Sequence, residues 1–462
     1  MCLFCDPATS SRLHYRAAGK TPAERLEGFA DVILRGGTIL TMDERHPEAE
    51  ALSVRDGLVQ SVGSLDAAMA KKGRSTRIID LEGRALIPGM VLATLPKDPL
   101  DLLGWQHIDL LEAEGDLHAY LAREVAPPLF SEPVFICLRS AGGGEAGGLG
   151  LLRAVEALCG PVPVAIRVCG TDEGWANGAM EALAGRSSGV APAAGANLPR
   201  RDIGGLLRPF AQRATHSLSS VARALATTVA AAREQGFTLV VDNSMGSLAG
   251  REEVEAAAVL AGGKRQMRIE AVAHRRLRAE WDGRLPPGVR PEMLRVQAAL
   301  IDAGDEPEEM QAEALSLSRA GWRLVFTPGD AHELEAAVQI CARLQRDGVN
   351  QPIRHRMEIG FDPDATHLAA LAELPVDLSI ECGGEAPLHK LGLQSGNGYG
   401  PSAVKRRLCA VTRDAARRRG LDHVAGTIMP GRQADFTLLE QLPPASGPIR
   451  VAGTWVDGIP VQ

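Results

Sequence analysis

The chain has few aromatic residues, no excess of basic charge and no long apolar run. Aromatic side chains make up 4% of the 462 residues, which leaves few stacking platforms for single-stranded nucleic acid. The formal net charge of −7 argues against a phosphate-backbone partner, which requires a basic face. No apolar run approaches the ~18 residues of a membrane span, and the polar segment 1–28 lacks the apolar core of a signal peptide. We therefore expect neither nucleic acid nor membrane as a partner.

Cysteine is also used sparingly, and its eight positions are scattered. Several lie in apolar runs, as Cys137 does, so buried free thiols are expected rather than disulfides. Cys2 and Cys5 have the spacing of half a zinc site, but no second Cys or His pair follows at metal spacing nearby. This usage is typical of a reducing compartment, and we expect a cytoplasmic protein.

The chain is rich in apolar segments that are separated by turn residues. With 45% hydrophobic and 23% charged residues it can bury a large core in more than one domain. Asp56-Gly57 lies between the apolar runs 51–54 and 58–62, and Asp457-Gly458 follows the run 454–456. An Asp-Gly pair beside apolar runs is a strong hairpin signal, because both turn residues need positive φ. The sequence predicts a polar extension at 1–28 and a small β-sandwich domain built from both termini, 29–90 and 424–462.

Between these ends, short apolar strands alternate with Ala- and Leu-rich helical stretches. This alternation predicts an α/β fold, a (β/α)8-type TIM-like barrel over 91–423. The expected strands are 238–242, 268–273, 294–296, 323–326, 353–357 and 376–380, with one more near Leu86. The Gly-rich segment 383–402 has no clear eighth strand, so we expect a barrel that is gapped or irregular there. The runs 134–138 and 162–168 predict further strands in a subdomain inserted at about 100–235.

Four stretches have the form of known motifs. The segment 30–43 is similar to the first strand of a known protein family. The segment 79–89 is similar to the strand that leads into the motif PGF-[IV]-D-x-H-x-H of the same family. Trp175-Ala176-Asn177 is similar to the end of xHxxWVN, and 426–436 to G-x-[IL]-x-P-G-K-x-A-D-[FL]. Nearly the whole chain thus resembles the amidohydrolase superfamily, in the branch of N-substituted formamide deformylase-like proteins.

This resemblance implies one or two divalent metals at the C-terminal mouth of the barrel. Such a metal lowers the pKa of a bound water and polarises the scissile carbonyl. The family's ligands are His-x-His on the first strand, a lysine, and one His each from the fifth and sixth strands. This chain has other residues at those positions: Thr94, Pro96, Leu300, Phe326 and Ile359. Because four of these five offer no lone pair, we expect the usual metal centre to be absent and no cofactor to be bound.

Four other side chains are candidates for an altered site at the mouth. Asp242 ends the second strand, and Asp330 and His332 follow the fifth. Glu385 lies in the Gly-rich loop, near the position of the family's eighth-strand Asp. Paired carboxylates there could support acid–base work. Equally, His332 could open a helix and the acids could lie on the surface, while His355 is expected to be an interior, hydrogen-bonded histidine.

Three functions remain open at this point. The vacant ligand positions favour a non-catalytic binding or scaffolding subunit, a pseudoenzyme with a protein partner or a second copy of itself. The first alternative is an active hydrolase of non-peptide carbon–nitrogen bonds with an altered site, and only this alternative calls for a divalent metal. The second alternative is a sensor of a small amide-like molecule.

Overall fold

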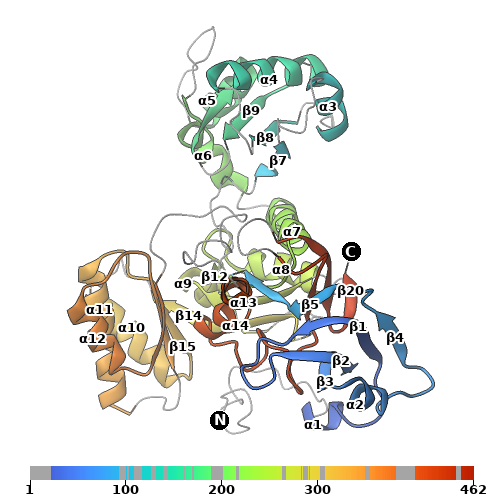
Figure 1. Cartoon of the computed structure of the whole chain (residues 1–462). Coiled ribbons are helices and arrows are strands. Elements are labelled where there is room, and N and C mark those ends of the chain that lie inside the picture. The colour runs from blue at the N-terminus through green and yellow to red at the C-terminus, as the bar shows by residue number, and fades with distance from the viewer. Residues whose placement is uncertain are drawn as a thin grey trace. The chain divides into compact units, whose positions relative to one another are not determined.

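The structure is a computed structural model, and it describes most of the chain (Figure 1). The described residues are 22–92, 100, 103–108, 117–125, 132–138, 144–160, 162–168, 171–188, 201–214, 218–262, 267–281, 283–284, 290, 292–301, 307–348, 354–380, 401–443 and 449–461. Two compact units are present. The first combines Met1–Leu95, Thr228–Gly384 and Leu388–Gln462, and the second combines Pro96–Thr227 with Glu385–Pro387.

In the described residues of the first unit, the two ends of the chain build one eight-stranded sheet, so both termini contribute to one β structure, as predicted. Its strands are β1 (Val32–Leu40), β2 (Glu48–Arg55), β3 (Leu58–Gly63), β4 (Arg77–Asp80), β5 (Ala85–Pro88), β18 (Phe436–Leu439), β19 (Val451–Val456) and β20 (Ile459–Val461). The order is β20-β19-β18-β5-β1-β2-β3, with β4 paired to β1. Two short helices accompany it, α1 (Pro22–Arg25) and α2 (Leu65–Met69).

Both predicted hairpins are confirmed. Asp56 and Gly57 have φ of 49° and 74°, and they join β2 to β3. Asp457 and Gly458 have φ of 56° and 72°, and they join β19 to β20. Two consecutive positive φ values are the signature of the tight turn that suits the twist of a hairpin.

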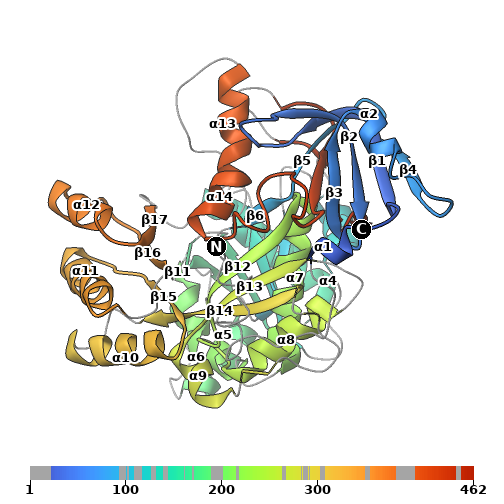
Figure 2. The ribbon, with the colours of Figure 1, turned by 90° about the horizontal axis from the view of Figure 1, so that it is seen from below.

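The second sheet of the first unit has seven parallel strands in the described part of the chain and curls like part of a barrel (Figure 2). The strands are β6 (Met90–Leu92), β12 (Phe237–Met245), β13 (Arg268–Ala273), β14 (Leu294–Ile301), β15 (Arg323–Phe326), β16 (His355–Ile359) and β17 (Val376–Ile380), with β6 and β17 at its edges. The helices of this region are α8 (Arg251–Gly262), α9 (Arg275–Glu280), α10 (Pro307–Arg319), α11 (Ala331–Arg346), α12 (Ala365–Ala372), α13 (Pro401–Val411) and α14 (Arg413–Arg418). Helix α7 (Leu218–Glu234) begins in the second unit and ends in the first. The α/β fold with an incomplete TIM-like barrel is confirmed.

The start of this barrel differs from the sequence prediction. Leu86 lies in β5 of the terminal sheet, and the parallel sheet begins with β6. The two strands are separated by Gly89, where an added Cβ would lie 1.9 Å from Oγ1 of Thr238 on β12. Glycine therefore lets the chain pass from one sheet to the other in a single residue.

Helix α14 lies against the open side of the curled sheet. It contacts both edge strands, β6 and β17. Ala415 and Ala416 of α14 pack with Val91 of β6 and with Leu239 and Val241 of β12. Most of the segment expected to lack an eighth strand, 383–400, lies outside the described residues.

In its described residues, the second unit contains a five-stranded sheet and helices. Its strands are β7 (Gln106–Ile108), β8 (Val134–Leu138), β9 (Val164–Val168), β10 (Glu173–Ala176) and β11 (Arg201–Asp202), in the order β11-β10-β9-β8-β7. Its helices are α3 (Leu117–Glu124), α4 (Gly144–Cys159), α5 (Gly178–Ser188) and α6 (Ile203–Ala214). The run 134–138 is a strand over its full length, and 162–168 contains β9.

The motif residue Asn177 has a structural role in this unit. Its Oδ1 accepts the N–H groups of Val164 at 3.0 Å and Met180 at 2.9 Å, and its Nδ2 donates to the carbonyl of Val162 at 2.8 Å. One buried amide thereby joins β9 to the start of α5.

The cysteines differ in part from the expectation. Cys159, Cys341 and Cys409 are free, but Cys137 of β8 is disulfide-bonded, so the prediction of free thiols is wrong for that residue. An apolar run such as 135–138 shows that a thiol is buried, but not whether a second sulfur packs against it.

Candidate functional site

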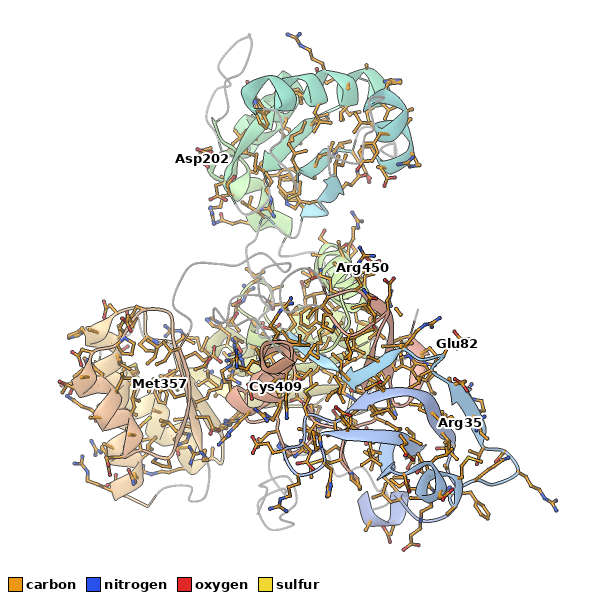
Figure 3. All side chains as sticks on the ribbon, viewed as in Figure 1. Arg35, Glu82, Asp202, Met357, Cys409 and Arg450 are labelled. Atoms are coloured by element: carbon orange, nitrogen blue, oxygen red, sulfur yellow. The ribbon has the colours of Figure 1, made fainter. Side chains whose placement is uncertain are left out.

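The curled sheet has a face covered by helices and an opposite, inner face. Leu324 and Met357 belong to the apolar cluster that includes the helices α10, α11 and α12, and Met357 is labelled in Figure 3. Side chains of a strand alternate between faces, and residues in register on neighbouring parallel strands share a face. Val325, which is in register with Arg356, therefore lies on the inner face, and so do Arg356 and Glu358.

A charged network fills this inner face near the C-terminal ends of β12 and β16. Arg356 Nε forms an ion pair with Glu358 Oε1 at 2.7 Å. Asn243 of β12 donates from Nδ2 to Glu358 Oε2 at 2.7 Å and accepts from Arg356 at 2.9 Å. The guanidinium of Arg419, which follows α14, also donates to Glu358. We call these four side chains the Glu358 network.

The network is buried, and its charges compensate one another. The side chains of Arg356, Arg419 and Glu358 are 4%, 2% and 14% exposed. Burial would raise the pKa of Glu358, but the positive charges of Arg356 and Arg419 outweigh it and lower that pKa. Burial lowers the pKa of Arg356 to about 9, although Glu358 opposes the shift. Each ion is thus stabilised by the others rather than by water.

A second carboxylate, Glu270 of β13, lies on the same inner face. Its Oε1 is 3.5 Å from Nε of Arg295 on β14, and its Oε2 has no hydrogen-bond partner among the described residues. Burial raises the pKa of Glu270 to about 6, against the lowering effect of Arg295, Arg268 and Arg356.

The donor set of the Glu358 network does not fit a divalent metal. It offers one carboxylate and one amide, and the other two members are guanidinium groups, which only donate hydrogen bonds. A cation added beside them would be repelled by both, at about 4 kcal/mol per pair of unit charges 4 Å apart and an effective dielectric constant of about 20. In the described part of the chain, no group of three or more His, Cys, Asp or Glu side chains is placed to hold a metal ion.

Two of the candidate mouth residues, Asp330 and His332, share the N-terminus of α11, whereas Asp242 lies in β12. Asp242 is fully buried, and its Oδ1 accepts the N–H of Ser244 at 3.0 Å. Asp330 is exposed and caps α11 by accepting the N–H of Glu333 at 2.9 Å. His332 is the second residue of α11 and is exposed, which matches the helix-opening alternative. Glu385 lies outside the described residues.

The positions aligned with metal ligands divide between the two faces. Leu300 packs with Val272, Ala298 and Val325 on the inner face. Phe326 and Ile359 belong to the apolar cluster between the sheet and the helices. Thr94 and Pro96 lie outside the described residues.

Sequence reasoning missed the partners of Glu358. Asn243 and Arg419 are 115 and 61 residues away from Glu358, so no local pattern in the sequence connects them to it. Arg419 is the last of three consecutive arginines, 417–419, which by themselves indicate only a basic helix end. The expected interior histidine is present: His355 is buried, and its Nδ1 accepts the N–H of Leu324 at 3.2 Å.

Comparison with known proteins supports the fold more strongly than it supports an activity. No family model matches the chain. Over 161 residues it is 27% identical to the exoenzymes regulatory protein AepA of Pectobacterium carotovorum subsp. carotovorum, covering 33% of this chain and 34% of that protein. Over 62 residues it is 34% identical to the protein LONG AFTER FAR-RED 3 of Arabidopsis thaliana, covering 13% and 11%. The matches thus span about a third or less of the length of these curated relatives.

Two solved structures match over most of their length. An uncharacterized metal-dependent hydrolase from Pyrococcus horikoshii OT3 aligns with a TM-score of 0.57 at 15% identity, covering 89% of this chain and 97% of that one. An uncharacterized metal-dependent hydrolase from Pyrococcus furiosus aligns with a TM-score of 0.59 at 13% identity, covering 90% and 100%. The fold of this chain is therefore that of metal-dependent hydrolases, as the amidohydrolase resemblance predicted.

Proposed function

We propose that this chain is a non-catalytic protein of the metal-dependent hydrolase fold, a pseudoenzyme that serves as a binding or scaffolding subunit. The Glu358 network carries the proposal. It lies on the inner face near the C-terminal strand ends, the end at which barrels of this kind place their chemistry. There the chain has two guanidinium groups and no set of metal-binding side chains among the described residues.

The Glu358 network should stabilise this part of the barrel. Breaking a buried ion pair by removing one partner is costly, because it leaves an uncompensated charge. Arg419 comes from the segment after α14, and Glu358 from β16. Their contact therefore holds the end of α14 against the inner face of the sheet.

Metal analysis of the purified chain tests the proposal. The protein is dialysed against buffer without chelator and its Zn, Fe and Mn contents are measured by mass spectrometry, with the similar hydrolase from Pyrococcus furiosus prepared in parallel. We expect well under one equivalent per chain, and no hydrolysis of amides, lactams or ureas with or without added metal. About one tightly held equivalent, or metal-dependent turnover, would refute the proposal.

A binding or scaffolding subunit acts through a partner, which we propose is another protein or a second copy of this chain. The molar mass of the purified chain, measured by light scattering during size exclusion, distinguishes the two. A dimer supports self-association, whereas a monomer directs the search to co-purifying proteins.

A second candidate function, hydrolysis of a carbon–nitrogen bond, has one observation in its favour. Glu270 lies on the inner face with a free carboxylate oxygen in the described structure, and its pKa of about 6 suits a general base near neutral pH. If the chain turns over any amide, the variant E270Q should abolish that activity without unfolding the protein. Unchanged turnover in E270Q would exclude this role.

A further inference from the structure

A cavity of about 150 Å³ lies at the other end of the barrel strands. Arg268 is the first residue of β13 and Arg295 the second of β14, so both line the cavity from the N-terminal ends of their strands. Gly57 of the β2–β3 turn and Asp457 of the β19–β20 turn line it from the terminal sheet. The cavity is therefore distinct from the Glu358 network near the C-terminal strand ends.

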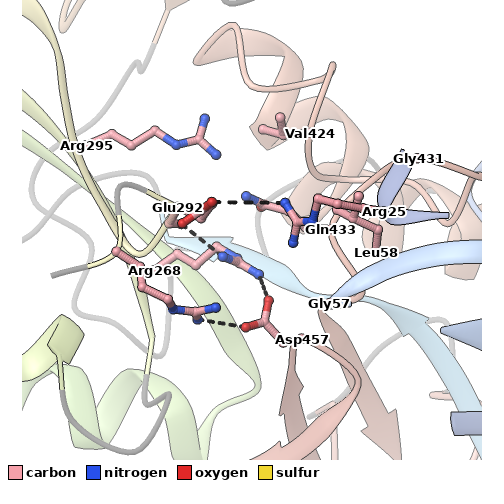
Figure 4. A pocket seen from close by; sticks show the side chains of 11 residues that line it. Arg25, Gly57, Leu58, Arg268, Glu292, Arg295, Val424, Gly431, Gln433 and Asp457 are labelled. Atoms are coloured by element: carbon pink, nitrogen blue, oxygen red, sulfur yellow. Dashed lines mark hydrogen bonds and ion pairs between the residues drawn. The ribbon is translucent and has the colours of Figure 1, made fainter. Parts of the chain in front are cut away.

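Four arginines among the described residues line this cavity, and three of them are paired with carboxylates at hydrogen-bond distance. Figure 4 shows the pairs that converge on Asp457. Arg268 binds Asp435 at 2.6 Å and 3.0 Å, and it also binds Asp457. Arg25 binds Asp56 at 2.9 Å, and Arg290 binds Asp457 at 2.8 Å. The positive charges of these three guanidinium groups are thus compensated by carboxylates.

Arg295, the fourth, is different. Its one ion pair among the described residues is the 3.5 Å contact from Nε to Glu270, and it makes no hydrogen bond there. Its side chain is 18% exposed, and in Figure 4 its guanidinium extends apart from the pairs around Asp457, with no dashed line reaching it. The terminal nitrogens of Arg295 are thus available donors with a positive charge.

Gln433 also lines the cavity, and its side-chain oxygen is a hydrogen-bond acceptor. This residue is 8% exposed, and its buried Oε1 has no hydrogen-bond partner among the described residues. A buried acceptor left without a partner costs free energy that a bound donor would recover. The guanidinium of Arg295 can donate to an anionic acceptor, and Oε1 of Gln433 can accept from a donor.

We propose that this cavity binds a small oxyanion that also carries an O–H donor, of which hydrogen phosphate is the simplest example. The anionic oxygens accept from Arg295 in a charge-assisted pair, and the protonated oxygen donates to Gln433. The site shares no residue with the Glu358 network, and its Arg295 contacts Glu270, the candidate base of the alternative function.

Calorimetric titration of the full chain at neutral pH and fixed ionic strength tests the site, with inorganic phosphate and sulfate as probes. Sulfate has the same shape and charge class but no O–H donor at this pH. We expect phosphate to bind more tightly than sulfate. R295M should weaken phosphate binding about tenfold or more, and Q433M should reduce phosphate to the level of sulfate. The exposed control R251M, whose side chain pairs with Glu255 away from the cavity, should bind both probes like the unmodified chain.

A second substitution keeps the test decisive if R295M unfolds. R295K retains the charge but not the planar fork, so it should bind phosphate with an intermediate affinity. The proposal is overturned if phosphate does not bind at about 10 mM or if R295M or R295K binds it as the unmodified chain does. Equal affinity for sulfate and phosphate, unchanged in Q433M, would also overturn it.

Discussion

Arg268 of β13 donates two hydrogen bonds to the carboxylate of Asp435, from Nε at 2.6 Å and from a terminal nitrogen at 3.0 Å. The two side chains are 2% and 6% exposed and lie 167 residues apart in sequence. Asp435 comes just before β18, so this fork-shaped pair joins the parallel sheet to the terminal sheet. Burial raises the pKa of Asp435, and the positive charge of Arg268 opposes that shift.

The substitution R268M should therefore destabilise the chain strongly. It removes the cation that compensates Asp435 and Asp457, and breaking a buried pair of this kind costs about 3–5 kcal/mol. Urea denaturation followed by circular dichroism measures the loss, with the exposed R251M as the control expected to stay within about 0.5 kcal/mol. A loss below about 1 kcal/mol in R268M would contradict this role.

Most strands could be predicted because their signals lie in the local sequence. The Asp56-Gly57 and Asp457-Gly458 turns were found because positive φ is a property of two residues and needs no tertiary context. The strands 323–326 and 376–380 were predicted to the residue, since Thr327-Pro328 follows the first and Pro375 precedes the second. The strand starting at Leu294 was predicted too short, because its continuation through Ala298 and Ala299 is equally typical of a helix.

Contacts between distant residues are what the sequence could not supply. The crossing at Gly89 depends on Thr238, and the network at Glu358 depends on Asn243 and Arg419. None of these relationships leaves a periodic signal in the chain. The candidate mouth acids were chosen because they follow strands, which does not reveal that Asp330 caps a helix.

The variant E358Q tests the network in the barrel. A neutral amide in place of the carboxylate leaves Arg356 and Arg419 facing each other without their shared anion, so we expect a loss of about 3–5 kcal/mol. Thermal unfolding gives the change, and E373Q, at an exposed carboxylate that ends α12, is the matched control. Equal melting temperatures for E358Q and E373Q would show that the network contributes little.

His355 should make the chain sensitive to acid. Burial, with a smaller effect of Arg323, lowers its pKa from 6.5 to about 4, and its Nδ1 accepts a backbone hydrogen bond that only the unprotonated nitrogen can accept. Because the folded pKa is depressed, the stability is present above pH 6.5 and is lost as the pH falls through 4, by about 3 kcal/mol in total. H355Q keeps an acceptor but does not titrate, so its stability should fall less between pH 7 and pH 4. The exposed H332Q should follow the unmodified chain, and parallel curves for H355Q would contradict the assignment.

Glu270 should have the opposite pH dependence. Burial raises its pKa from 4.5 to about 6, so its contribution to stability is fully present below pH 4.5 and is lost as the pH rises through 6. The shift corresponds to about 2 kcal/mol at pH 7.5. E270Q stays neutral throughout, and it should therefore be more stable than the unmodified chain at pH 7.5 by up to that amount and nearly equal to it at pH 4.5. Urea denaturation at the two pH values measures the difference, with E373Q as the control. A destabilised E270Q at pH 7.5 would mean that the contact of Glu270 with Arg295 outweighs the burial of its charge.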